Sequence, residues 1–252
     1  GLTNETWFLD TPPRHLRLAS AGGMALQSAV ARRWQEVTGR PLLQGYGLTE
    51  TSPVLCFNPL GKARDGSIGV PVPSTLMACL DDEGRPLPPG ARGEIAAKGP
   101  QVMTGYWKRP DETALVLQDG WFRTGDIGVM DDDGYFHVVD RKKDMVVVSG
   151  FNVYPNEVED CIATHPGVLE SAVIGVPDGA TGEAVRAYVV ARDRGLTGDE
   201  IRAHCRAHLT AYKVPKQVEF RDVLPKSSVG KILRKDLRAE ALAEVAALRE
   251  AG

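Results

Sequence analysis

Four consecutive charged residues, RKKD (141–144), constrain the fold more than any other feature, because they separate two apolar runs. The runs are YFHVVD (135–140) before them and MVVVSG (145–150) after them. Charged side chains are costly to bury, so we expect this segment to lie between two apolar cores rather than inside one. A chain of 252 residues is long enough for two ordinary domains. We therefore place a domain boundary after residue 140.

The first domain, residues 1–140, begins with a strand–helix–strand pattern, and after it the predicted elements become shorter. Between residues 60 and 140, short apolar segments alternate with turn sequences such as DDEG, PPGARG and DDDG. This alternation indicates a small barrel or sandwich attached to an α/β layer. The predicted elements are strands at 15–20 and 41–47 and helices at 22–39 and 109–117.

The second domain, residues 141–252, mixes helices and strands and is predicted to be a small α+β unit. Its predicted helices begin at Pro155, span 198–209 and run from about Lys231 to Arg249. Its predicted strands lie near 171–177, 184–191 and 216–220.

Charge and cysteine usage restrict the partners and the compartment. The net charge is −3 with both signs interspersed, so no basic block indicates a nucleic-acid partner. Undiluted apolar runs such as MVVV (145–148) are far shorter than the roughly 20 residues that a membrane span needs. Four scattered cysteines with no C-x-x-C pair favour the reducing cytoplasm over a disulfide framework or a zinc ribbon.

The segment GYGLTETSP (45–53) follows a predicted strand and is a candidate ligand-binding loop. Gly47 permits close approach of the backbone to a ligand, and Tyr46 offers a flat face to a base. Thr49 offers a hydroxyl group to phosphate, and Glu50 offers a hard oxygen ligand to Mg²⁺. The alternative is a glycine-rich turn that Thr49 caps.

Two further segments carry residues that suit a nucleotide. In GWFRTGDIG (120–128), Asp126 can accept both hydroxyl groups of a ribose, or it can be a turn residue bonded to the local backbone. Arg141 and Lys143 belong to three adjacent cations that either lie on a solvated surface or hold phosphate and ribose at the domain joint. In the second case Lys143 is a pivot whose backbone angles change as the domains rotate.

A metal site is a weaker alternative elsewhere in the second domain. His204 and His208 are spaced four residues apart on a predicted helix, as metal-binding pairs are. Cys205 stands where the zinc-protease motif needs glutamate, and no third ligand is evident. A histidine pair without metal is therefore the favoured interpretation.

The segment PKSSVGKILRKDLR (225–238) invites comparison with a phosphate-binding P-loop. The P-loop pattern needs glycine where Pro225 stands and serine or threonine where Ile232 stands, so the pattern is broken. Lys231 therefore needs another explanation.

Seven segments, taken in order, resemble the acyl-CoA synthetases of the adenylate-forming enzyme superfamily. They are SAGGM, GYGLTETSP, GSIGVPVPS, GEIAAKGPQVMTGYW, GWFRTGDIG, DRKKDMVVVSGFNVYPNEVED and PKSSVGKILR. The segment SGFNVYPNEVED is similar to the corresponding segment of bacterial long-chain fatty-acid CoA ligases.

The resemblance implies a fold and a reaction. The fold is the end of a large α/β domain with a barrel subdomain, followed by a mobile C-terminal lid. The reaction joins a fatty carboxylate to coenzyme A through an acyl-adenylate, with ATP and Mg²⁺ required and AMP and pyrophosphate released. An aryl or coumarate-type CoA ligase is the alternative within this enzyme class.

The resemblance also assigns roles to residues of this sequence. Gly22, Gly23 and Gly47 would line the nucleotide site with Tyr46 on the adenine face, and Thr49 would contact phosphate. Glu50 would hold Mg²⁺, Asp126 and Arg141 would bind ribose, and Lys143 would be the hinge. The Gly150–Phe151 turn would approach the pantetheine of coenzyme A. Lys231, next to Gly230, would be the adenylation lysine.

The family's Ser/Thr/Gly-rich phosphate loop is not among these residues. We therefore expect the chain to be the C-terminal portion of a longer ligase, inactive by itself, or else a non-catalytic nucleotide-binding fragment. Its expected location is the cytoplasm, with peripheral contact to the inner membrane face suggested by analogy. An exposed sheet edge in a truncated α/β layer would also permit association into oligomers.

Overall fold

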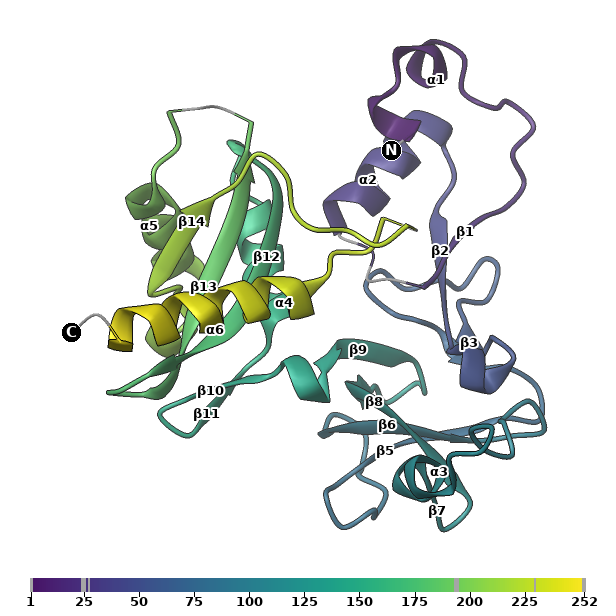
Figure 1. Cartoon of the computed structure of the whole chain (residues 1–252). Coiled ribbons are helices and arrows are strands. Elements are labelled where there is room, and N and C mark those ends of the chain that lie inside the picture. The colour runs from purple at the N-terminus through teal and green to yellow at the C-terminus, as the bar shows by residue number, and fades with distance from the viewer. Residues whose placement is uncertain (1, 24–25, 27, 193–194, 229, 251–252) are drawn as a thin grey trace. The chain divides into compact units, whose positions relative to one another are not determined.

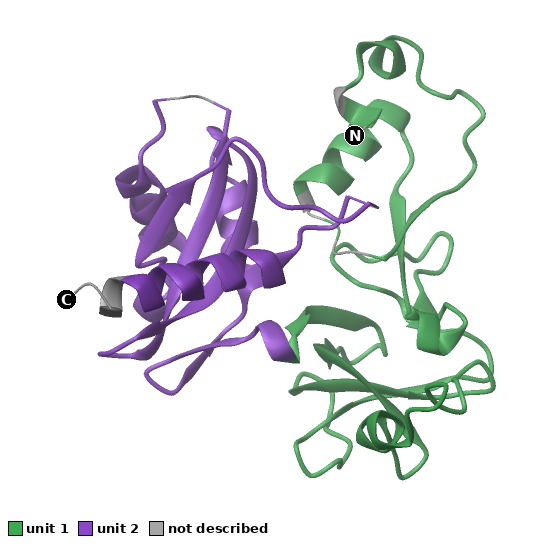
Figure 2. Ribbon diagram, in the orientation of Figure 1, with its two compact units in different colours: residues 1–142 green, residues 143–252 purple. Residues whose placement is uncertain are grey.

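The computed structural model describes residues 2–23, 26, 28–192, 195–228 and 230–250. The chain forms two compact units, Gly1–Lys142 and Lys143–Gly252 (Figure 2). The division lies two residues after the boundary expected from the sequence. The reason is that Lys142 is bound to the first unit: its Nζ lies 2.9 Å from Asp82 Oδ1 and 3.4 Å from Glu94 Oε2.

The first unit contains the predicted strand–helix–strand pattern (Figure 1). Strand β1 pairs in parallel with β2, and β3 and β4 continue this sheet in antiparallel fashion. The bounds are β1 (Ala19–Ala21), α2 (Ser28–Thr38), β2 (Leu42–Tyr46), β3 (Cys56–Phe57) and β4 (Val70–Pro71), preceded by η1 (Leu2–Asn4) and α1 (Thr6–Asp10). The strand predicted at 15–20 is short, because only its last residues find the partner strand β2 and Leu18 is 51% exposed. The predicted helix start falls partly on residues 24, 25 and 27, which lie outside the described residues.

The rest of the first unit is a curled antiparallel half-barrel (Figure 1). Its strands run in the order β5-β6-β8-β7, and β9 pairs with β8. The bounds are β5 (Leu76–Leu80), β6 (Arg92–Lys98), α3 (Pro110–Val116), β7 (Leu117–Gln118), β8 (Trp121–Met130) and β9 (Phe136–Arg141). Its core packs Cys56, Ile68, Cys79, Ile95 and Phe136 against one another. The predicted α/β layer with a barrel-like subdomain is thus confirmed.

The second unit is a five-stranded sheet with helices on both faces. The strand order is β11-β10-β13-β12, and β14 adds in parallel to β13. The strands are β10 (Val146–Val148), β11 (Phe151–Val153), β12 (Val168–Asp178), β13 (Gly182–Ala191) and β14 (Gln217–Phe220). The helices are α4 (Pro155–Ala163), α5 (Gly198–His208) and α6 (Arg234–Glu250), with the one-turn helix η4 (Ala211–Lys213). The one-turn helix η3 (Lys142–Asp144) spans the division between the units.

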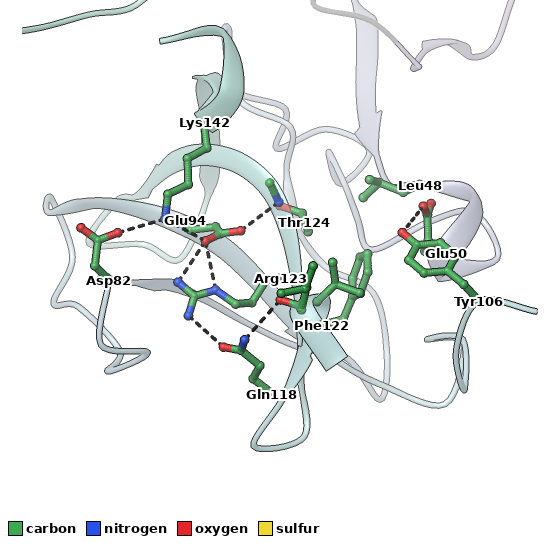
Figure 3. Close-up of a pocket in the computed structure, with 13 residues that line it drawn as sticks. Leu48, Glu50, Asp82, Glu94, Tyr106, Gln118, Phe122, Arg123, Thr124 and Lys142 are labelled. Carbon is green, nitrogen blue, oxygen red and sulfur yellow. Dashed lines mark hydrogen bonds and ion pairs between the residues drawn. The ribbon is translucent and has the colours of Figure 1, made fainter. Parts of the chain in front are cut away.

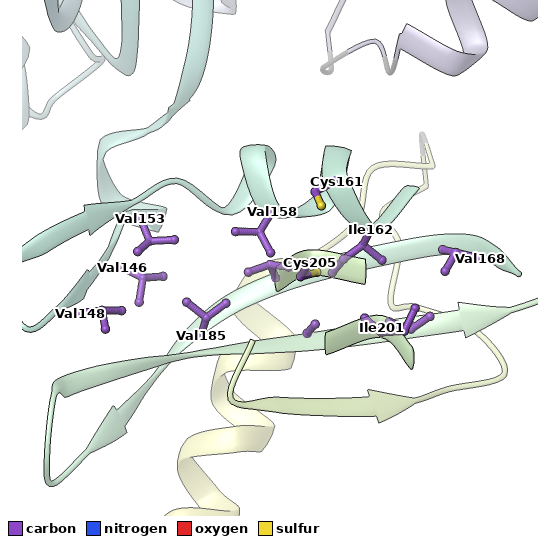
Figure 4. Close-up of a cluster of buried hydrophobic side chains, with 13 residues drawn as sticks. Val146, Val148, Val153, Val158, Cys161, Ile162, Val168, Val185, Ile201 and Cys205 are labelled. Atoms are coloured by element: carbon purple, nitrogen blue, oxygen red, sulfur yellow. The ribbon is translucent and has the colours of Figure 1, made fainter. Parts of the chain in front are cut away.

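Strand β13 explains why the second unit needs two layers of helix. Side chains alternate between the two faces of a strand. Val185, Ala187 and Val189 belong to the core that contains α4 and α5 (Figure 4). Tyr188 and its neighbours on the opposite face belong to the core that contains α6. Because both faces are buried, the strand reads as a nearly continuous apolar run.

The helices of the described residues include none that is long and apolar enough to cross a membrane.

Arg234, at the start of α6, fastens that helix to α4. Its Nε and Nη2 donate to the two carboxylate oxygens of Glu159 at 3.0 and 2.6 Å, and Nη2 also donates to Asn156 Oδ1 at 2.5 Å. The arginine side chain is 18% exposed. A forked guanidinium matches a carboxylate with two parallel bonds, which fixes the direction of α6 as well as its position.

We expect Arg234→Ala to lower the free energy of unfolding of the second unit by about 3 kcal/mol, because the partly buried Glu159 loses its cation. Hydrogen exchange at the amides of β12 and β13 measures this change. Arg206→Ala, an exposed position on α5, is the control and should change the value by no more than about 0.5 kcal/mol. Equal effects of the two substitutions would contradict the anchoring role.

Candidate functional site

Two glycine-containing segments of the first unit meet at one edge of the small parallel sheet. Gly22 and Gly23 follow β1, and Gly47 follows β2. The carboxyl ends of parallel strands lie at the same edge, where α/β folds bind ligands. The two segments are in close contact, because a Cβ atom on Gly22 would lie 3.2 Å from the carbonyl oxygen of Gly45.

Backbone packing explains why residue 47 is glycine, and the sequence did not reveal this packing. A Cβ atom at this position would lie 1.8 Å from the carbonyl oxygen of Pro53, which is a backbone atom. The turn after β2 therefore folds back on itself so tightly that only glycine fits.

The hydroxyl group of Tyr46, the last residue of β2, donates to Asp126 Oδ2 at 2.6 Å. Asp126 lies on β8, where it pairs in register with Arg141 of β9. Arg141 Nε lies 3.7 Å from Asp126 Oδ1. Three residues predicted separately to bind nucleotide are thus brought together. Asp126 belongs to a strand rather than to a turn, in contrast to the alternative interpretation of the T-G-D sequence.

In the Tyr46–Asp126 pair, the protonation state of the Tyr46 phenol is defined. Burial, and next the carboxylate of Asp126, raise the pKa of the Tyr46 phenol far above its ordinary value. Tyr46 therefore stays protonated and donates to Asp126 throughout the neutral range. A carboxylate with one oxygen fixed in this way is pre-oriented for a further polar group.

Glu50 lies in the one-turn helix η2 (Thr49–Thr51) and lines a cavity of about 450 Å³ (Figure 3). The hydroxyl group of Tyr106 donates to Glu50 Oε1 at 2.9 Å. Partial burial and this carboxylate raise the pKa of Tyr106, so the phenol remains a donor. Tyr106 belongs to the family-like segment GEIAAKGPQVMTGYW, but sequence reasoning gave it no role.

Thr51 rather than Thr49 holds this turn together. Thr51 Oγ1 accepts the backbone N–H of Leu48 at 2.9 Å and donates to the Leu48 carbonyl at 3.0 Å. Thr49 is exposed, and its hydroxyl group makes no hydrogen bond within the described part of the chain. Thr51, and not Thr49, therefore caps this turn.

A charged network at the other end of the cavity holds the backbone beside Asp126 (Figure 3). Glu94, which is 7% exposed, accepts from Arg123 Nε at 3.0 Å and from the N–H of Gly125 at 3.1 Å. Lys142 adds a third contact to Glu94, and the Asp82 carboxylate raises the pKa of the Lys142 ammonium. Sequence reasoning missed Glu94 and Arg123, because each has the appearance of a routine strand residue.

The remaining predicted residues belong to the second unit. Lys143 lies in η3, and its carbonyl accepts from Arg238 Nη1 at 3.3 Å. Gly150, with Ser149, forms the two-residue turn between β10 and β11, and both have positive φ (82° and 50°), which fits a type I′ turn. Phe151 is 56% exposed and stacks on Tyr212 at a centroid distance of 4.9 Å.

Lys231 sits on a tight hairpin just before α6. The N–H of Ser227 donates to the Lys231 carbonyl at 2.8 Å, and the Lys231 N–H donates to Ser227 Oγ at 3.2 Å. Gly230 has φ +81°, a conformation that favours glycine. Because Arg234 anchors the chain three residues later, the lysine stem starts from a well-defined backbone.

One sequence interpretation needs correction. No third metal ligand was evident for His204 and His208, but the fold places Cys161 of α4 beside them. The sequence separation between Cys161 and the histidines hides this contact, because it depends on the packing of α4 against α5.

Two family models match the sequence. A model described as AMP-binding enzyme matches residues 5–107, and a model described as AMP-binding enzyme C-terminal domain matches residues 157–231.

Among known proteins, the chain is 59% identical over 240 residues to a long-chain-fatty-acid–CoA ligase from Yersinia pestis, covering 95% of this chain and 43% of that protein. It is 55% identical over 245 residues to a protein of the same name from Salmonella typhimurium, covering 97% of this chain and 44% of that protein. The chain thus spans somewhat less than half the length of these curated relatives.

Solved structures of other ligases are also similar to this chain. The anthranilate CoA ligase AuaEII in complex with anthranoyl-AMP matches with a TM-score of 0.88 and 33% identity, over 97% of this chain and 48% of that one. ATP-bound MatB from Rhodopseudomonas palustris matches with a TM-score of 0.87 and 39% identity, over 95% of this chain and 49% of that one.

The contact at Gly47 predicts that Gly47→Ala destabilises the first unit by at least about 2 kcal/mol, because main-chain atoms of Pro53 must move to admit the methyl group. All four tryptophans (7, 34, 107 and 121) lie in this unit, so urea unfolding followed by tryptophan fluorescence measures the change. Gly61→Ala is the control: φ is +75° and no atom lies within 4 Å, so only backbone strain of about 1 kcal/mol is expected. A loss at Gly47 no larger than at Gly61 would contradict the packing account.

Proposed function

Because this chain belongs to the AMP-binding enzyme family, we propose that it is the C-terminal part of an ATP-dependent ligase that joins a fatty carboxylate to coenzyme A. The names of its relatives from Yersinia pestis and Salmonella typhimurium support the long-chain fatty-acid class. The observation that carries the proposal is the contact among Tyr46, Asp126 and Arg141. These three residues come from separate segments, and a nucleotide-binding site needs them close together.

The proposed reaction has two steps. The carboxylate of the fatty acid attacks the α-phosphorus of ATP, which gives an acyl-adenylate and releases pyrophosphate. The thiol of coenzyme A then attacks the acyl carbon, which gives the thioester and releases AMP. The protein's task in the first step is to orient the nucleotide and to neutralise charge that gathers around the α-phosphate.

Asp126 is proposed to bind the ribose of the nucleotide. A carboxylate accepts hydrogen bonds from two adjacent hydroxyl groups, which selects a ribose with both groups present. Tyr46 holds Oδ2 of this carboxylate, and Arg141 approaches Oδ1, so the carboxylate plane is fixed before the nucleotide binds. Gly22, Gly23 and Gly47 lie at the same sheet edge, and the adenine is proposed to lie there against Tyr46.

Glu50 and Thr49 are proposed to act at the phosphates. Mg²⁺ usually binds through one or two carboxylates together with phosphate oxygens, and the half-buried Glu50 on the cavity wall fits that requirement. The bound Mg²⁺ would neutralise phosphate charge. Tyr106 orients the Glu50 carboxylate, and the exposed hydroxyl group of Thr49 offers a donor to a phosphate oxygen.

Lys231 is proposed to bring its ammonium group to the attacking carboxylate and the α-phosphate during adenylation. A compact ammonium on a long stem can contact both groups in the transition state. Lys143, the first residue of the second unit, is the proposed pivot that carries Lys231 in for the first step and withdraws it for the second. The Gly150–Phe151 turn, with Phe151 exposed, is then proposed to meet the pantetheine arm of coenzyme A.

An aryl substrate is the second candidate, because the matching structure of AuaEII is an anthranilate CoA ligase holding anthranoyl-AMP. Product formation from palmitate, coumarate and anthranilate distinguishes the two classes. The chain alone is proposed to bind AMP without turnover, and calorimetry with AMP together with a thioester assay tests this. Turnover by the 252 residues alone would contradict the fragment proposal.

In the protein as its gene encodes it, with any residues that flank these, Lys231→Ala should lower adenylate formation at least about 10²-fold. The rate of thioester formation from supplied acyl-AMP should stay within about twofold, because the lysine is withdrawn in that step. Pyrophosphate exchange and thioester release measure the two rates. Lys235→Ala, an exposed lysine four residues later, is the matched control and should leave both rates unchanged. Equal loss of both steps in Lys231→Ala would refute the proposed role.

For nucleotide binding, Asp126→Asn should weaken AMP affinity at least about tenfold, because the neutral amide accepts fewer and weaker bonds from ribose. Tyr46→Phe should weaken it less, by a few-fold, because it frees rather than removes the carboxylate. Isothermal titration calorimetry measures both. Tyr135→Phe, which breaks the hydrogen bond to the Lys62 carbonyl in the same unit, is the control and should have no effect. An unchanged affinity in Asp126→Asn would rule out the ribose contact.

A further inference from the structure

A cluster of metal-binding side chains lies in the second unit, apart from the residues assigned to the nucleotide. Cys161 comes from α4, and His204 and His208 come from the last two turns of α5. One ligand atom from each of these three residues lies within 4.8 Å of the other two. We propose that Cys161, His204 and His208 bind Zn²⁺ or a related divalent transition-metal cation.

The donor set selects the kind of metal. A thiolate and two imidazoles are ligands for Zn²⁺ and related transition metals, whereas Mg²⁺ and Ca²⁺ prefer oxygen. With metal–ligand bonds of about 2.0–2.3 Å, tetrahedral ligand atoms lie roughly 3.3–3.8 Å apart. The three atoms, within 4.8 Å of one another, need side-chain adjustments of only about 1 Å to reach that geometry.

Each histidine has one ring nitrogen at hydrogen-bond distance from a backbone carbonyl. His208 Nδ1 lies 2.9 Å from the carbonyl oxygen of His204, and His204 Nε2 lies 3.0 Å from the carbonyl oxygen of Cys161. His204 Nε2 also lies 2.8 Å from Thr164 Oγ1. A carbonyl only accepts, so in the tautomers that donate to these carbonyls the opposite ring nitrogens carry the lone pairs. Such backbone partners fix the tautomer and the ring plane of metal-binding histidines.

Solvent is the natural fourth ligand. His165 lies nearby, with its ring edge-on to His204 at 5.2 Å, but its Nδ1 accepts the N–H of Gly167 at 3.2 Å. His208 is exposed, so both the cation and a water molecule can enter from the surface. The site would therefore have three protein ligands and one open position.

Binding must displace the proton of the Cys161 thiol. The cation binds the thiolate of Cys161, and the proton of the thiol passes to solvent. The bound cation would clamp the end of α4 to the end of α5. Both helices contribute to the core that supports β12 and β13, so the clamp would stabilise the unit that carries Lys231.

Titration of the full chain with Co²⁺, after removal of metal by a chelator, tests the proposal. We expect one Co²⁺ per chain, a thiolate-to-cobalt charge-transfer band, and loss of the band when Zn²⁺ is added. His208→Ala, a surface substitution that should not disturb folding, is expected to weaken Co²⁺ binding at least about tenfold. Cys161→Ser is expected to remove the band.

Two controls complete the experiment. His137→Ala changes a histidine of the first unit and should leave the titration unchanged. Cys205→Ser changes the fully buried neighbour of Cys161 and should keep the band. Absence of the band in the unaltered chain, or undiminished affinity in His208→Ala, would overturn the site. A band that survives Cys161→Ser but disappears in Cys205→Ser would overturn the assignment of Cys161.

Discussion

The hydrogen bond from Tyr46 to Asp126 joins two parts of the first unit that are 80 residues apart in the sequence. Tyr46 ends the parallel strand β2, and Asp126 lies on the half-barrel strand β8. Without this contact the glycine-bearing sheet edge and the carboxylate would belong to separate sites. The charged network around Glu94 supports the contact from the other side, because it holds the N–H of Gly125, the residue before Asp126.

The second unit is organised around a different constraint, the burial of β13 on both faces. One face packs α4 and α5, and the other packs α6. The Lys231 hairpin runs directly into α6, and Arg234 fixes that helix to α4. The proposed role of Lys231 therefore depends on a hairpin whose following helix is fixed to the core of its own unit.

The sequence predicted the elements better than the contacts. Hydrophobic periodicity located α5, β13 and β14 to within one or two residues, because each pattern reflects a face that is buried locally. It placed a strand at 15–20, where only the last residues pair, since pairing depends on a distant partner. The motif residues Tyr46, Asp126 and Arg141 were identified singly, but their contact is a tertiary property. The same is true of Tyr106, Glu94 and the position of Cys161 beside two histidines.

A crystal structure of the chain grown with AMP would examine the nucleotide site without relying on turnover. If the account is correct, both ribose hydroxyl groups lie within hydrogen-bond distance of the Asp126 carboxylate, while Tyr46 keeps its bond to Oδ2. The adenine then lies beside Gly22, Gly23 and the ring of Tyr46. AMP bound elsewhere on the molecule, with Asp126 in contact only with Tyr46 and Arg141, would contradict the account.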